Sequence, residues 1–432
     1  MKIQVEDEGK CRKRVHVEAP AEKIQPEYDR LVQEYRKVAR IPGFRKGRAP
    51  SEVVEKRFLK DILENTKQNL LPRIYKEAVE EEDIAPVAVI DVSNERIGKD
   101  EGLSFDFTVD VAPEFKLPRY GKISLKGQKT DVTDEEIEEA VHRVMDSMAR
   151  YEENSGQPAG PGDMLQLDYS GAIEGKPVSE MAPQITGMGE GSDFWIILNG
   201  QEFLPGLSKQ LEGVMAGDSK TLKITFPEDY HVKEVAGKDA SYDVTVKRIR
   251  KKVLPEMDEE FFKNISAANE AEFREKVKEE LVAAKTNSEN RRLKNEISRH
   301  LLDKTDLDVP VSQLEQEKNA IARNMIQSMA QQGLGRQQLE ERKDQILSEA
   351  EKTSVDRVKL MYILGRIAEE ENIEVAETEV DERIESMASG YGMETARMKA
   401  ELEKQNALDR IKSELRQEKT LDFLLGQAKI KK

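Results

Sequence analysis

The alternation of apolar and polar side chains predicts that residues 1–112 mix strands and helices. Every second side chain is apolar between residues 103 and 111, which predicts a strand with one buried face. Apolar side chains at helical spacing predict an earlier helix with Pro26 in its first turn; they are Tyr28, Leu31, Tyr35 and Val38. A second helix is predicted to begin near Pro50, with an apolar face made of Val54, Phe58 and Ile62.

The segment 41–49 separates these two predicted helices. Pro42 ends the first helix, and Gly43 and Gly47 permit a tight loop. Residues 1–112 are therefore predicted to form an α+β domain with a loop at a helix–helix junction.

Residues 113–150 are predicted to link this domain to the next one. Pro113 and Pro118 mark the exit from the first domain. Thr133 and Glu136 have the spacing of a capping box, which predicts one helix within the linker.

The pattern changes twice more along the chain. Residues 151–250 are rich in glycine, and apolar positions alternate over 165–169, 222–226 and 242–246, which indicates a small β-rich domain. Residues 251–432 hold only two prolines and long stretches of apolar residues at helical spacing, which predicts an all-α C-terminal domain. The whole chain is thus predicted to be a multidomain α+β protein.

Composition supports several domains and excludes some classes of protein. A length of 432 residues predicts about three domains. The single cysteine, Cys11, excludes an intramolecular disulfide. The first 20 residues lack the pattern of a signal peptide, and no apolar run approaches the length needed to cross a bilayer. We therefore expect a cytoplasmic protein with no membrane partner.

The charge is unevenly distributed. The chain carries a net charge of −16, yet residues 36–60 hold nine basic side chains against two acidic ones, a local charge of +7. A solvated helical face is the simpler explanation of such a cluster. The alternative is an anionic partner, and the loop within the cluster favours it: Phe44 beside three cations suits a surface that is part protein and part RNA.

The sequence Gly-Phe-Arg-Lys-Gly-Arg-Ala-Pro at residues 43–50 resembles the ribosome-attachment signature of the trigger factor family. The resemblance implies contacts from Phe44, Arg45 and Lys46 to a ribosomal protein beside the exit tunnel of the large subunit and to adjacent ribosomal RNA. The ribosome-binding residues that it implies are Gly43, Phe44, Arg45, Lys46, Gly47 and Arg48.

The β-rich region is similar to an FKBP-type peptidyl-prolyl isomerase domain. The similarity lies in Leu-Asp-Tyr-Ser-Gly at 167–171, Phe-Leu-Pro-Gly-Leu at 203–207 and Phe-Pro-Glu-Asp-Tyr-His at 226–231. Prolyl isomerisation needs an apolar pocket that fits the twisted amide, and it needs no nucleophile, metal or cofactor. The catalytic pocket that the resemblance implies is lined by Tyr169, Phe194, Leu204, Leu207, Tyr230 and Tyr242, with Phe203 nearby.

Two departures from the FKBP pattern predict weak isomerase activity. Leu207 stands where the family has a large aromatic residue at the pocket floor. Val178 and Ser179 replace an aromatic residue followed by an acidic one, and the segment 180–192 after them is long.

The role of six methionines in the helical region has two possible interpretations. Flexible thioethers suit a groove for varied partners, whereas methionine at helical spacing is more often core packing. They are Met325, Met329, Met361, Met387, Met393 and Met398. The trigger factor resemblance implies a helical cradle for unfolded chains, without assigning residues to it.

No cofactor is expected. The four histidines lack the spacing of metal ligands, and the glycine-rich segment 187–191 lacks the lysine and helix of a phosphate-binding loop. The lysines at the C-terminus are interpreted as a solvated end.

The resemblance as a whole implies an ATP-independent chaperone that docks at the ribosomal exit tunnel and binds unfolded nascent polypeptides. Isomerisation of proline-containing peptides would be an accessory activity, and the family also forms homodimers away from the ribosome. Two alternatives stay open at this point. One is a free-standing FKBP-type prolyl isomerase with a helical partner-binding tail, for which the basic loop would have no use. The other is a periplasmic holding chaperone, which would need a signal peptide.

Overall fold

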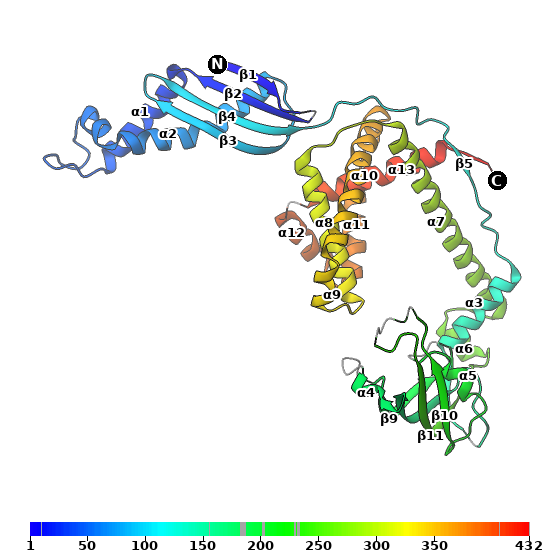
Figure 1. Ribbon diagram of the computed structural model, residues 1–432. Helices are drawn as coiled ribbons and strands as arrows, with labels where there is room; N and C mark the ends of the chain where they lie inside the picture. Colours follow the sequence, from blue (N-terminus) through cyan, green and yellow to red (C-terminus); the bar gives the residue numbers. More distant parts are fainter. Residues whose placement is uncertain are drawn as a thin grey trace. The chain divides into compact units, whose positions relative to one another are not determined.

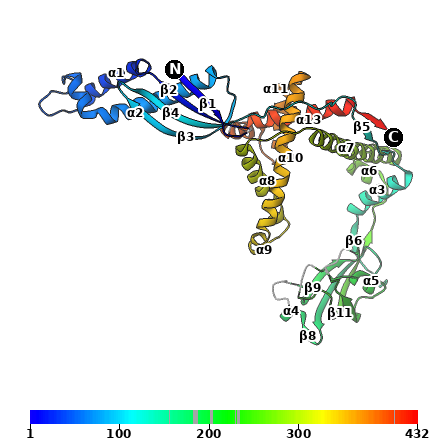
Figure 2. The ribbon, with the colours of Figure 1, turned by 45° about the horizontal axis from the view of Figure 1, so that its top comes forward.

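The computed structural model describes residues 1–431 except 10, 155, 182–186, 201–203, 229, 231–233 and 406. The chain forms two compact units. The first unit combines Met1–Gln128 with Glu289–Lys432, and the second is Lys129–Ser288. Figure 1 and Figure 2 show the ribbon from two directions.

The N-terminal part of the first unit is an antiparallel sheet with two helices. Its strands have the order β1-β2-β4-β3. The elements are β1 (Lys2–Asp7), β2 (Arg12–Ala19), α1 (Ala21–Val38), α2 (Ser51–Glu81), β3 (Pro86–Gly98) and β4 (Gly102–Val111). The alternation predicted for residues 103–111 is confirmed, because Phe105 and Phe107 are fully buried and pack with Ile74 of α2.

The two helices differ from their predictions in detail. Helix α1 begins at Ala21, so Pro26 lies beyond the first turn rather than in it. Tyr28 and Leu31 are buried as expected, but Val38 is exposed at the end of the helix. Helix α2 begins at Ser51, directly after Pro50, as predicted. Its backbone is non-helical at Phe58, where the helix is kinked.

The rest of the first unit is helical. Its core joins α7, α10 and α13 through Ile297, Ile363 and Leu424. The elements are α7 (Glu270–Lys304, which begins in the second unit), α8 (Val311–Gln331), α9 (Arg336–Glu341), α10 (Lys343–Glu370), α11 (Glu377–Gly390), α12 (Thr395–Lys404) and α13 (Leu408–Gln427). The predicted helix start at Pro310 and the break at 333–335 are both found.

The C-terminal lysines are predicted from the sequence to form a solvated end, but Lys429 and Lys431 belong to a short strand. Strand β12 (Lys429–Lys431) pairs in parallel with β5 (Ser124–Lys126). The side chains of β12 are exposed, so the lysines reach solvent while the backbone is held by hydrogen bonds. A strand of three residues whose partner lies about 300 residues earlier leaves no periodic signal in the sequence.

The sheet and the helical body of the first unit meet at the N-terminus of α8. Asp110 accepts hydrogen bonds from Arg12 Nε at 2.7 Å and from the backbone N–H of Ser312 at 2.9 Å. Cys11 Sγ lies 3.5 Å from the carbonyl oxygen of Asp308. Pro310, the N-cap of α8, has no side-chain group to cap the helix. Asp110 supplies that cap from a strand far away in sequence.

The second unit holds a six-stranded antiparallel sheet and a small helical cluster. The strand order is β10-β11-β7-β8, with β6 paired to β11 and β9 paired to β7. The elements are α3 (Asp134–Ser147), β6 (Arg150–Glu153), β7 (Met164–Ile173), β8 (Lys176–Pro177), α4 (Val178–Met181), β9 (Glu190–Ile197), α5 (Leu207–Leu211), β10 (Ser219–Thr225), β11 (Asp239–Val253) and α6 (Glu259–Asn264).

The β-rich middle region and the helical C-terminal region confirm the predicted fold class. The capping box of α3 is also present, with Thr133 and Glu136 each bonded to the backbone N–H of the other. Helix α3 packs with α6 and the start of α7. The boundaries at 112, 150 and 250 stay predictions.

Candidate functional site

The loop between α1 and α2 consists of two consecutive tight turns. The N–H of Phe44 bonds the carbonyl of Ile41 at 3.1 Å, and the N–H of Arg48 bonds the carbonyl of Arg45 at 2.9 Å. Gly43 and Gly47 stand at the third position of each turn with φ of +90° and +80°. Side chains other than glycine rarely adopt these angles, so both glycines are needed for the shape of the loop.

The two ends of the loop are anchored in a small apolar cluster. Ile41 and Ala49 are buried there against Val54, the first fully buried residue of α2. Because the ends are fixed, the middle of the loop is presented outward. Phe44 is 43% exposed, and Arg45, Lys46 and Arg48 are exposed as well.

The positive charge of this loop has no acidic partner in the part of the chain that the structure describes. Among the described residues, none of the nine basic side chains between 36 and 60 forms an ion pair. Glu55, one of the two acidic residues in the segment, is paired with Lys99 at 2.8 Å. The loop therefore combines one exposed aromatic ring with cations that are free for a partner.

Several of the aromatic side chains predicted to line the isomerase pocket lie close together in the second unit. The rings of Tyr169 and Phe194 meet edge to face at 5.7 Å, and Tyr242 lies 6.5 Å from Tyr169. Tyr230 packs on Phe226 at 4.9 Å. Of the six predicted residues, Phe194 is 40% exposed and Tyr230 is half-buried, whereas the other four are buried. Phe194 and Tyr230 are therefore the members of this set that are open to solvent.

An irregularity in β9 directs Phe194 toward this cluster. The register between β7 and β9 shifts between Leu167 and Tyr169, where Asp193 has φ of +55°. Asp168 accepts the N–H of Asp193 at 2.8 Å, and Lys247 bonds both carboxylates. The bonds from Lys247 and from that N–H lower the pKa of Asp168. Sequence reasoning missed this network, because side chains brought together from three strands leave no local pattern.

The two departures from the FKBP pattern lie in the core. Leu207 starts α5 and Val178 starts α4, and both are buried. At these positions the core therefore holds aliphatic groups where the FKBP pattern has aromatic rings. Phe203, Asp229 and His231, which belong to the predicted motifs, lie outside the described residues, as do parts of the segment 180–192.

Five of the six methionines of the helical body pack against its cores. Met398 is buried, and the other five are partly buried. Core packing, the simpler of the two interpretations, fits all of them except Met361, which is partly buried but belongs to none of these clusters. Exposed apolar side chains of the body are instead Val311, Ile326, Leu347 and Tyr391.

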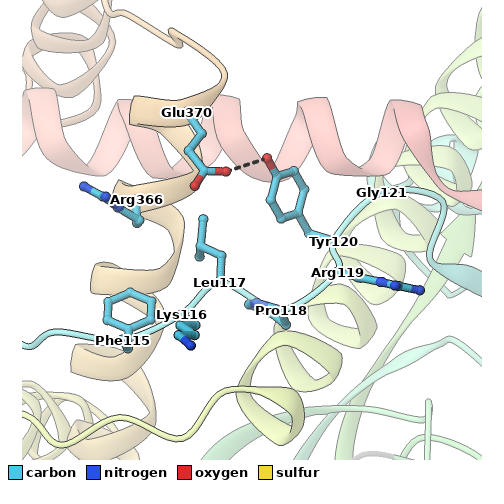
Figure 3. Close-up of a pocket in the computed structure, with 9 residues that line it drawn as sticks. All are labelled: Phe115, Lys116, Leu117, Pro118, Arg119, Tyr120, Gly121, Arg366 and Glu370. Atoms are coloured by element: carbon cyan, nitrogen blue, oxygen red, sulfur yellow. Dashed lines mark hydrogen bonds between the residues drawn. The ribbon is translucent and has the colours of Figure 1, made fainter.

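Sequence reasoning also missed a cavity of about 640 Å³ in the first unit, shown in Figure 3. The segment 115–121 lines it together with Arg366 and Glu370 of α10. The hydroxyl of Tyr120 donates to Glu370 at 3.1 Å and to Glu371 at 2.8 Å. Burial and these carboxylates raise the pKa of Tyr120. These hydrogen bonds hold the segment 115–121 against the end of α10. The residues that line the cavity therefore have a structural role.

Within the described ranges, no group of histidine, cysteine and acidic side chains could hold a metal ion. Among the helices of those same ranges, none has both the length and the apolar character needed to cross a membrane.

Comparisons with known proteins find similarity to the same family from the start to the end of the chain. The family profile described as bacterial trigger factor protein matches residues 1–144, and that of its C-terminus matches 271–426. The profile of FKBP-type peptidyl-prolyl cis-trans isomerase matches 155–247. Trigger factor of Opitutus terrae is 31% identical over 438 residues, which cover 100% of this chain and 98% of the relative. The chain belongs to the trigger factor family.

Other trigger factors support this membership. That of Geobacillus sp. strain WCH70 is 32% identical, with 96% of each chain covered. A solved structure titled "Promiscuous Substrate Recognition in Folding and Assembly Activities of the Trigger Factor Chaperone" covers 99% of both chains with a TM-score of 0.54. Its sequence identity is 20%, so this likeness concerns the fold.

Family membership confirms the general function implied by the sequence. As a member of the trigger factor family, the chain is a ribosome-associated chaperone that carries a peptidyl-prolyl cis-trans isomerase domain. A free-standing isomerase with a helical tail is disfavoured, because trigger factor profiles match on both sides of the isomerase domain.

Proposed function

We propose that this chaperone docks at the exit tunnel of the large ribosomal subunit through residues 43–48. The supporting observation is the loop itself, which presents Phe44 and three unpaired cations from two tight turns. Phe44 enters an apolar cleft of a ribosomal protein, and Arg45, Lys46 and Arg48 meet carboxylates or the phosphates of ribosomal RNA.

Once docked in the cytoplasm, the protein binds unfolded nascent polypeptides without ATP. Exposed apolar side chains of the helical body support this part of the proposal, because they remain available for a partner. The aromatic cluster of the second unit takes proline-containing segments, with Phe194 and Tyr230 in contact with the peptide. Isomerisation is slow here, because Leu207 and Val178 place aliphatic groups in the core behind the aromatic cluster, where the FKBP pattern has aromatic rings. Away from the ribosome the protein forms a homodimer.

Co-sedimentation with ribosomes tests the docking site. The triple variant Phe44→Ala, Arg45→Ala, Lys46→Ala is expected to lose binding by about 100-fold or more, because it removes the anchor and two charge contacts together. A matched control, Tyr391→Ala, Arg397→Ala, Lys404→Ala, removes an exposed aromatic ring and two cations from the helical body. It is expected to sediment like the wild type.

A salt titration separates the two kinds of contact. Binding of the wild type should weaken steeply with ionic strength, and the slope for the triple variant should be lower by about 1 for each phosphate that it no longer binds. Equal sedimentation of wild type and triple variant would remove the loop from the docking site.

A further inference from the structure

Tyr242 is one of the six residues expected to line the proline pocket, yet its ring is 0% exposed. A fully buried ring cannot contact a peptide substrate. Its hydroxyl instead donates to the carbonyl oxygen of Met188 at 2.9 Å, within the protein core. Burial raises the pKa of this hydroxyl, so it stays protonated and able to donate.

The bond to Met188 is one of three that hold consecutive carbonyl groups. The hydroxyl of Tyr169 donates to the carbonyl of Gly187. The N–H of Gly171 donates to the carbonyl of Gly189 at 2.7 Å. Each carbonyl group of residues 187–189 is thus held by a hydrogen bond. These residues directly precede β9, which contains Phe194.

Close packing around glycines makes this arrangement specific. A Cβ atom at Gly171 would lie 2.3 Å from the ring of Tyr242, and one at Gly191 would lie 2.6 Å from the ring of Tyr169. At Gly189 it would lie 2.4 Å from the backbone nitrogen of Ser179. The segment is therefore clamped between the two tyrosine rings and the start of α4.

The fixed segment 187–189 also affects Tyr169 and Phe194, which form the wall of the proposed pocket. Tyr169 contacts Phe194 edge to face at 5.7 Å, and Gly191 stands opposite Tyr169 in the pairing of β7 and β9. A movement of 187–189 would be transmitted through the start of β9 to Phe194, whose ring contacts Tyr169. Stabilisation of a twisted amide depends on a pocket whose shape is set before the substrate arrives.

We propose that Tyr242 is a positioning residue of the isomerase, which acts through the carbonyl of Met188 to fix the wall formed by Tyr169 and Phe194. This inference rests on the proposed assignment of the proline pocket. It also gives the hydroxyl a function that a phenylalanine of the same shape would lack.

The test uses the full-length chain with Tyr242→Phe, which keeps the buried ring and removes only the hydroxyl. Isomerase activity on a proline-containing tetrapeptide is measured by a protease-coupled assay. We expect kcat/KM to fall about fivefold, mainly through kcat, because the wall is displaced while the side chains that touch the substrate are all retained. Tyr362→Phe is the matched control: it removes a hydroxyl bonded to Gln313 at 2.5 Å in the helical body, and activity should be unchanged.

Hydrogen exchange by mass spectrometry distinguishes positioning from general destabilisation. In Tyr242→Phe, exchange should rise at 171 and 187–191 while the amides of β10, β11 and the rest of β7 keep their protection. Wild-type activity in this variant would overturn the proposal. So would a loss of activity accompanied by faster exchange through the whole sheet, since that result marks a purely structural role.

A second variant keeps the proposal testable if Tyr242→Phe fails to fold. Gly189→Ala disturbs the same segment from the side of Ser179 and leaves Tyr242 intact. It should reproduce the loss of kcat with a similarly local rise in exchange, and unchanged activity would contradict the proposal. A wild type without isomerase activity would instead refute the proposed pocket, while the exchange data would still show whether Tyr242 fixes 187–189.

Discussion

His16 and Asp106 form a close pair on the solvent side of the N-terminal sheet. Their side chains, Nδ1 to Oδ1, are 2.5 Å apart, and Asn94 donates to the second oxygen of Asp106 at 2.6 Å. The hydrogen bond with Asp106 raises the pKa of His16, although burial opposes the change. The folded state therefore binds a proton at His16 more tightly than the unfolded chain does.

This pair predicts a specific dependence of stability on pH. Its contribution is fully present below the unfolded pKa of His16, near 6.5, and it is lost as pH rises through the raised folded pKa. His16→Gln should therefore lower the free energy of unfolding most at pH 5.5 and least at pH 8. The difference should stay below about 1 kcal/mol, because the imidazole is partly exposed. Urea unfolding at both pH values measures it, and a difference that grows with pH would contradict the assignment.

Single residues also show where sequence reasoning stops. The roles of Gly43 and Gly47 could be predicted, because a glycine in a tight turn is a local requirement. The role of the Tyr242 hydroxyl could not, since its partner is a backbone carbonyl 54 residues away. Leu207 and Val178 were identified as departures from a pattern, but only the structure shows that both are buried.

At the scale of elements, the contact between β4 and α8 joins the N-terminal sheet to the helical body, and no sequence pattern predicts it. Asp110 is 1% exposed, and both of its oxygens are bonded. Burial alone would raise the pKa of Asp110, but the bonds from Arg12 and Ser312 outweigh it and lower the pKa. The helix N-terminus favours the negative charge as well.

Asp110→Asn should loosen this contact. An amide of the same shape has one acceptor oxygen, so it cannot accept from both Arg12 and Ser312. The nearby Cys11, the single cysteine of the chain, is buried at the same contact and reports on it. We expect its reaction with a thiol reagent to become about tenfold faster, which corresponds to one unsatisfied buried group.

The control for Asp110→Asn lies on the same strand. Asp106→Asn makes the same chemical change, but its partners His16 and Asn94 belong to the sheet itself. Its Cys11 should react at close to the wild-type rate. If both variants accelerated the reaction equally, the sheet rather than the contact with α8 would be the source of protection.

Elements differ in how far their pattern determines them. Strand β4 follows from strict alternation, and α8 follows from Pro310 and the long apolar face after it. Strand β5 exists only because β12 pairs with it, and the kink of α2 at Phe58 interrupts a face that reads as continuous in the sequence. Short elements and irregularities depend on distant partners, which single-sequence periodicity does not contain.

At the scale of the whole molecule, positive charge is concentrated in one segment of an acidic chain. A chain with a net charge of −16 is repelled by RNA over most of its surface, whereas residues 36–60 carry +7. In the proposed function, this contrast restricts attachment to the loop 43–48 and leaves the exposed apolar side chains of the helical body available for clients. The proposal thereby assigns docking and client binding to different residues of the chain.

Client binding is expected to depend on exposed apolar side chains of α8 and α10. The two helices pack together through Ile321 and Ile346, and Ile326 and Leu347 remain exposed beside that core. Changing both exposed residues to serine should leave the fold intact, because exposed side chains contribute little to stability. It should weaken the affinity for an unfolded protein about fivefold, since two apolar side chains no longer cover the client.

Suppression of aggregation of a chemically denatured protein, without ATP, measures this effect. The matched control replaces Val89 and Ile90, an exposed apolar pair on β3, by serine. If Ile326 and Leu347 bind clients, their double variant needs several times more chaperone for equal protection, whereas the β3 variant acts like the wild type. Equal loss in both variants would mean that clients bind any exposed apolar pair, and the helical body would then have no special place in holding nascent chains.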